Sequence, residues 1–148
     1  MNVRAGSEPK LIFPGLAGFY AAVSDLWYPM IRVAAGGSLL FHGWGKVAAG
    51  QFTIAPSLVK YGIQPAEPLG YFVVILETIG AACIILGLGT RFFAAAIAIE
   101  MAVIAFVVKG SLGFAQMELF ILFGIIFFAI ALRGGGPYSL DRMIGKEL

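Results

Sequence analysis

Residues 69–108 read LGYFVVILETIGAACIILGLGTRFFAAAIAIEMAVIAFVV, and this stretch decides the fold. It consists of two apolar runs, 69–88 and 91–108, which a short glycine-containing turn separates. Each run has the length of roughly 20 residues that an α-helix needs to cross the hydrocarbon of a bilayer. The stretch therefore predicts two transmembrane helices joined as a hairpin.

Two further apolar runs of similar length, 28–48 and 115–132, flank this hairpin. Apolar residues make up 60% of the 148 residues, and charged residues only 12%. A soluble domain of this size has no core large enough to bury so much apolar surface. We therefore predict an all-α integral membrane protein, an antiparallel four-helix bundle that forms a single domain over residues 1–148.

Two segments outside the four spans complete the predicted architecture. Residues 11–24 are mildly apolar, contain a proline and are too short to cross, so we expect an interfacial segment that lies on the membrane. Residues 49–68 form an outer loop, with a short helix expected from Ser57 to just before Gly62. Thr90 is a candidate N-cap for the third span.

The distribution of basic residues predicts the orientation in the membrane. With four crossings, both termini lie on one side. That side carries Arg4, Lys10, Arg32, Arg91, Arg133, Arg142 and Lys146, and the other side carries Lys46, Lys60 and Lys109. Because loops rich in lysine and arginine stay in the cytoplasm, both termini are expected there.

The composition excludes several classes of function. A single cysteine, Cys83, cannot form an intrachain disulfide, and a single histidine, His42, cannot provide bis-histidine haem ligation within one chain. The sequence contains no zinc-protease, P-loop or dinucleotide-binding motif. A net charge of +2 with scattered basic residues does not predict nucleic-acid binding. We expect no metal and no covalent cofactor, and no motif identifies catalytic residues.

Three glutamates, Glu77, Glu100 and Glu118, lie inside the predicted spans, where an unpaired charge is costly. Counting helical rise places His42, Glu77 and Glu100 roughly 10–13 Å below the outer boundary, as a candidate polar site in the bundle. Two carboxyls that face each other cannot both ionise cheaply, so one is expected to carry a proton. Such a site suits proton transfer, hydrogen bonding to a quinone or a polar ligand. Alternatively, one glutamate faces a partner subunit.

Two further interactions are expected near the ends of the bundle. Lys46 and Glu118 both lie about one turn inside the outer boundary, which predicts an ion pair at the outer rim. The alternative is a Lys46 side chain that extends to water at the interface. Arg32 is expected at the cytoplasmic end of the first span, near the turn at 139–141, with Asp141 as the nearest acidic candidate.

A series of short motifs follows the chain: Arg32, FHGWGK at 41–46, Glu77 with Gly80, LGLGTR at 86–91, Gly110, Glu118 and GPYSLD at 136–141. In this order and spacing they resemble the DoxX/DoxD-like family of small four-span bacterial membrane proteins. The resemblance covers about residues 26–142. His42 and Glu100 are candidates because of their depth and chemistry, and not because of the resemblance.

The resemblance implies an inner-membrane protein that is an oxidoreductase or an oxidoreductase subunit. Relatives are linked to thiosulfate:quinone oxidoreduction and to thiol or oxidative-stress systems. Since no residue here can store an electron, we expect a quinone-facing or partner-recruiting subunit that supports a membrane redox process. Its expected partners are the lipid bilayer, a quinone and a larger redox protein. The alternatives are a non-catalytic accessory subunit of a larger membrane complex and a small-solute or proton carrier.

Overall fold

The structure, a computed structural model, describes residues 11–146, and every regular element in this range is a helix. Its four long rods are α2 (Trp27–Ala48), the continuous rod Ala66–Leu86, the continuous rod Thr90–Val108, and α7 (Phe114–Arg133). The second rod is built from α4 (Ala66–Ile75), η2 (Leu76–Gly80) and α5 (Ala81–Leu86), and the third from α6 (Thr90–Val103) and η3 (Ile104–Val108). The predicted all-α fold is confirmed.

Three of the rods are long and apolar enough to cross a membrane: Ala66–Leu86, Thr90–Val108 and Phe114–Arg133. Within residues 11–146, α2 has the length of a span but not the same apolar character, because it carries Arg32, His42 and Lys46. The membrane character of the protein therefore rests on three helices. A fourth crossing by α2 stays a prediction.

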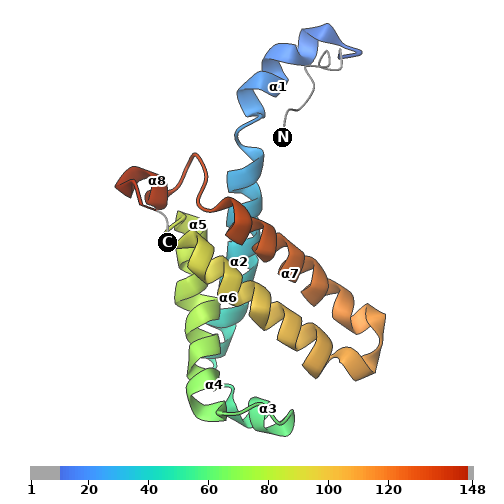
Figure 1. The fold of residues 1–148 in the computed structure, drawn as a ribbon, viewed down its shortest axis with the longest axis vertical. Coiled ribbons are helices and arrows are strands. Elements are labelled where there is room, and N and C mark those ends of the chain that lie inside the picture. The colour runs from blue at the N-terminus through green and yellow to red at the C-terminus, as the bar shows by residue number, and fades with distance from the viewer. Residues whose placement is uncertain (1–10, 147–148) are drawn as a thin grey trace, which may run out of the picture.

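The four rods are arranged as two pairs (Figure 1). The helix α2 lies beside the α4–η2–α5 rod along the long axis of the molecule, and α6 with α7 forms a hairpin that crosses these two at a steep tilt. Most of α7 faces outward, away from the protein interior. The rods are therefore splayed and do not form one parallel-sided bundle.

Short helices occupy the segments outside the rods. The expected interfacial segment contains η1 (Pro14–Leu16) and α1 (Ala17–Val23), and neither has a buried residue. The outer loop contains α3 (Ala55–Lys60), which packs on α4 through Ala55, Leu58 and Ala66. η4 (Gly110–Leu112) connects the third rod to α7, and α8 (Leu140–Ile144), which was not expected, follows α7.

Two rods contain a π-helical turn, η2 and η3. A π turn inserts an extra residue, which widens the helix and redirects the side chains on it, and such turns are frequent at functional sites. Glu77 lies in η2. The glycine Gly43 of α2 faces this turn so closely that a Cβ atom there would lie 2.5 Å from the carbonyl oxygen of Glu77. The two backbones therefore touch at the π turn.

Candidate functional site

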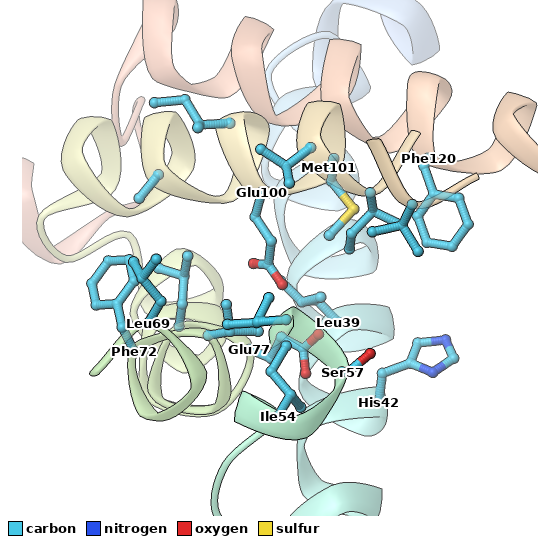
Figure 2. Close-up of a pocket in the computed structure, with 18 of the residues that line it drawn as sticks. Leu39, His42, Ile54, Ser57, Leu69, Phe72, Glu77, Glu100, Met101 and Phe120 are labelled. Atoms are coloured by element: carbon cyan, nitrogen blue, oxygen red, sulfur yellow. The ribbon is translucent and has the colours of Figure 1, made fainter. Parts of the chain in front are cut away.

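A cavity of about 560 Å³ opens between α2, α3, α4, η2 and the α6–α7 hairpin. Figure 2 shows its wall, which is mainly apolar and includes Leu39, Phe72, Met101 and Phe120. Its ionisable and hydroxyl side chains are Ser38, His42, Lys46, Ser57, Tyr61, Glu77 and Glu100. Mainly apolar walls with a few converging polar groups are typical of small-molecule sites.

Glu77 and Lys46 form an ion pair at this cavity. The Lys46 ammonium donates a hydrogen bond to Oε2 of Glu77. The carboxyl side is buried, whereas the Lys46 side chain remains 29% exposed. The π turn places the backbone of Glu77 against Gly43 of α2. Lys46 belongs to the same helix, so its side chain can reach the Glu77 carboxylate.

Glu100 enters the cavity from the middle of α6 and is only 8% exposed. Neither of its carboxyl oxygens has a hydrogen-bond partner within the described part of the chain. Figure 2 shows the side chains of Glu100 and Glu77 pointing into the same space from opposite walls. The charges that act on Glu100 are those of Glu77 and Lys46, and the Glu77 carboxyl lies close enough that the two carboxyls can share a proton. A buried polar group without a partner is costly, so this carboxyl is the best candidate for contact with a ligand.

His42 lies at the rim of the cavity, and its exposed ring points away from the two carboxyls (Figure 2). The sequence placed it in one deep layer with Glu77 and Glu100. The difference arises because Gly43 is the residue that faces the π turn. Successive positions on a helix are rotated by about 100°, so the side chain before Gly43 turns outward.

Glu118 is exposed on α7 and does not line the cavity. The expected pair of Lys46 with Glu118 is replaced by the pair of Lys46 with Glu77. Depth counting addresses only the height of a residue along its helix and gives no information on the direction of its side chain around the helix. Glu118 lies near the start of α7, and the α6–α7 hairpin crosses α2 at a steep tilt, with its turn away from α2 (Figure 1).

Arg32 lies at the other end of α2, with only 2% of its surface exposed. Its guanidinium donates to the carbonyl oxygens of Gly135, of Tyr138 at 2.6 Å and of Ile85 at 3.4 Å. The Tyr28 hydroxyl donates to the next carbonyl along, that of Gly134. These bonds attach the chain that follows α7 to both α2 and the second rod.

Asp141, which lies in α8 outside the membrane-capable rods, caps the start of α6. Its carboxylate accepts hydrogen bonds from the Gly89 N–H at 2.7 Å, the Thr90 N–H at 3.0 Å and the Thr90 hydroxyl at 2.7 Å. Gly89 is therefore the N-cap residue in place of Thr90, and the capping oxygens come from a distant segment. Burial raises the pKa of Asp141, but these hydrogen bonds and the nearby Arg32 charge bring it below its ordinary value.

Arg32 and Asp141 thus lie at one end of the molecule, and each has its own partners. Arg32 bonds to backbone carbonyls and Asp141 to the start of α6. Over residues 11–146 there is no group of three His, Cys, Asp or Glu side chains positioned to bind a metal ion, and Cys83 is a half-buried free thiol.

Sequence reasoning missed Gly43 and the π turn as parts of the site. A glycine inside a span was an available signal, since small residues allow helix backbones to approach closely. The π turn has no comparable signature in the residues 76–80. It depends on how the rods pack.

One comparison with known proteins finds a relationship. The family model described as DoxX matches residues 28–110, more than half of the chain, and this range contains α2, the second rod and the third rod. No curated protein and no solved structure matches the chain. Lys46, Glu77 and Glu100 all lie within the matched range. With its membrane-capable helices, the chain therefore belongs to the DoxX family of membrane proteins.

Proposed function

We propose that this DoxX protein is a quinone-facing subunit of a membrane redox system and that its cavity binds the quinone ring. One observation carries the proposal: the buried carboxyl of Glu100 meets no hydrogen-bond donor among residues 11–146 and points into an apolar cavity between membrane-capable helices. A quinone needs an apolar wall for its body and tail and a few polar groups for its ring oxygens. The cavity offers both.

The residues of the site also suit the proton chemistry of such a substrate. Reduction of a quinone to a quinol takes up two electrons and two protons. Glu77 and Glu100 both reach the cavity and can exchange protons with a bound ring, directly or through one water molecule. Since no residue of the chain can store electrons, a partner oxidoreductase must supply or remove them. The chain contributes binding, orientation and proton exchange.

The proposal includes a location in the bacterial inner membrane with both termini in the cytoplasm. In this orientation α2 is the fourth crossing, since its 22 residues extend about 33 Å as a helix. The two terminal nitrogens of the Arg32 guanidinium donate to backbone carbonyls, and Lys46 is paired with Glu77, which lowers the cost of placing them there. The cavity then opens in the outer half of the bilayer.

A proton carrier is the second candidate, and the same unpartnered Glu100 favours it. A carboxyl that lacks a fixed partner can bind and release a proton as its surroundings change. The two candidates differ in their need for a second molecule. A quinone site needs a ligand in the cavity, whereas a carrier moves protons across a sealed bilayer without one.

The test measures binding in lipid nanodiscs. Decylubiquinone, supplied as the quinone or as the quinol, is titrated into the wild-type protein by calorimetry, with Glu100→Gln as the test variant. Glu118→Gln is the matched control, because Glu118 lies in a membrane-capable helix but outside the cavity. We expect wild type and control to bind one molecule per chain, and Glu100→Gln to bind with altered affinity.

Two outcomes would reject the proposal. The first is that neither redox form binds to the wild-type protein, and the second is that Glu100→Gln and Glu118→Gln behave alike. Proton flux into sealed liposomes that contain the protein and no quinone, lost in Glu100→Gln, supports the carrier instead.

A further inference from the structure

We infer that the cavity selects its ligand by hydrogen-bond donation, so that it takes the reduced, hydroxyl-bearing quinol in preference to the oxidised quinone, with Glu100 as the acceptor. This inference rests on the proposed function and adds the redox form of the substrate. The two forms share one carbon skeleton and differ at the ring oxygens. A quinol hydroxyl donates and accepts, whereas a quinone carbonyl only accepts.

The inner part of the cavity has an excess of acceptors over donors. Among residues 11–146, Lys46 is the one lysine or arginine that lines it, and this lysine already donates to Glu77. The head group of Lys46 is partly exposed, so its remaining N–H groups can reach water. The hydroxyl and imidazole side chains that also line the cavity belong to the exposed residues Ser38, His42, Ser57 and Tyr61, whereas Glu77 and Glu100 are buried.

The excess of acceptors holds both when the two glutamates are ionised and when they share one proton. If both are ionised, Glu100 offers two oxygens that can only accept. If one proton is present, it can lie between Glu77 and Glu100, where it is consumed by the hydrogen bond between them. The oxygen lone pairs that remain free are again acceptors. A ligand that donates a hydrogen bond would therefore satisfy the free acceptors of the site.

The charge of the cluster favours a neutral donor over a cation. With one shared proton, Lys46, Glu77 and Glu100 together carry no net charge. A protonated amine would enter an apolar cavity with a charge that the cluster does not balance, at a high desolvation cost. A quinol hydroxyl brings the hydrogen without the charge.

The experiment compares four ligands on the wild-type protein in nanodiscs under anaerobic conditions, by calorimetry. The ligands are decylubiquinol, decylubiquinone, the dimethyl ether of decylubiquinol and decylamine. The ether keeps the ring and tail but removes both donors. We expect the quinol to bind roughly tenfold to hundredfold more tightly than the quinone or the ether, as expected for a hydrogen bond to a charged or strongly accepting group.

The variants test the assignment to Glu100. Glu100→Gln should lose most of the preference for quinol, because the amide places a donor where the wild-type protein has an acceptor. Glu118→Gln should keep the preference. The comparison of ligands on the wild-type protein remains decisive even if Glu100→Gln folds poorly.

The possible failures are distinguishable. Equal affinity for the quinol and its dimethyl ether overturns the inference but leaves the proposed function intact. Tighter binding of the oxidised quinone also overturns it. If decylamine binds more tightly than the quinol, Glu100 binds a cation, and the inference that the cavity selects a quinol is wrong. Failure of either redox form to bind removes the proposed function itself.

Discussion

Lys46 near the end of α2 is ion-paired with Glu77 in the π-helical turn of the second rod. The two residues are 31 positions apart, and the outer loop with α3 lies between them in the chain. Glu77 is buried, and Lys46 is partly exposed at the rim of the cavity. The pair balances one carboxyl of the site, and within residues 11–146 it leaves Glu100 as the carboxyl that no cation or other donor meets.

Removal of Lys46 should cost more stability than removal of Glu77. Lys46→Met leaves a buried carboxylate without its cation, and we expect a loss of about 2–3 kcal/mol in the free energy of unfolding. Glu77→Gln leaves a lysine that can reach water, with a loss of about 1 kcal/mol. The double variant should lose less than the sum of the two. Unfolding in one detergent gives all three values, and strictly additive losses would count against the pair.

Gly43 should be intolerant of alanine. A Cβ atom at Gly43 would lie 2.5 Å from the Glu77 carbonyl oxygen, so α2 must move away from the π turn, at a cost of about 1–3 kcal/mol. Gly45 is the matched control, because a Cβ atom there meets nothing within 4 Å. Gly45→Ala should be neutral or stabilising by up to about 1 kcal/mol. Thermal unfolding of the two variants compares them directly, and equal stability would contradict the close contact.

Asp141 should make stability depend on pH in the acidic range. Its folded pKa lies below the ordinary value of about 3.9. A depressed pKa contributes stability that is fully present above the unfolded value and is lost as the pH falls through the folded value. Asp141→Asn should therefore cost about 1–3 kcal/mol at pH 7, and this difference from wild type should shrink below about pH 4.

The measurement is the free energy of unfolding of wild type and Asp141→Asn between pH 3 and pH 7. Asp25→Asn is the control, since Asp25 is exposed in the turn between α1 and α2. A difference between wild type and Asp141→Asn that stays constant down to pH 3 would show that the carboxylate charge does not support the α6 cap.

The proposed topology predicts opposite accessibility at two serines. In a Cys83→Ala background, cysteine at position 57 in α3 should react with an impermeant maleimide on intact cells. Cysteine at position 7 should react only after the membrane is opened. If position 7 is labelled from outside, the proposed orientation is wrong, and the cavity faces the cytoplasmic half of the membrane.

The rods could be predicted from the sequence because their signal is local. The runs 69–88 and 91–108 are apolar throughout, and the glycines between them permit a tight turn, so their helices follow from length and composition. Gly87 and Gly89 have positive φ values of 70° and 55°, which glycine adopts without strain. Counting residues along the helices also identified Glu77 and Glu100 as residues inside the apolar helices.

The partners of the charged residues could not be predicted in the same way. Counting along a helix gives height, but a pair also requires the correct direction around each helix and the correct tilt between helices. The π turn at Glu77 and the tilt of the α6–α7 hairpin change both, so Lys46 meets Glu77 and not Glu118. The rotation that brings Gly43 against the π turn also places His42 at the rim.

The amino-acid sequence by itself therefore determined the membrane character, the positions of the helical rods and the residues that bring polar chemistry into them. These properties depend on the local pattern of apolar and polar side chains along the chain. Only the tertiary structure decided that Lys46 balances Glu77, that Asp141 caps α6, and that Glu100 is left facing the cavity. Each of these depends on contacts between segments that are distant in the chain. The packing of the helix backbones determines which of these segments meet.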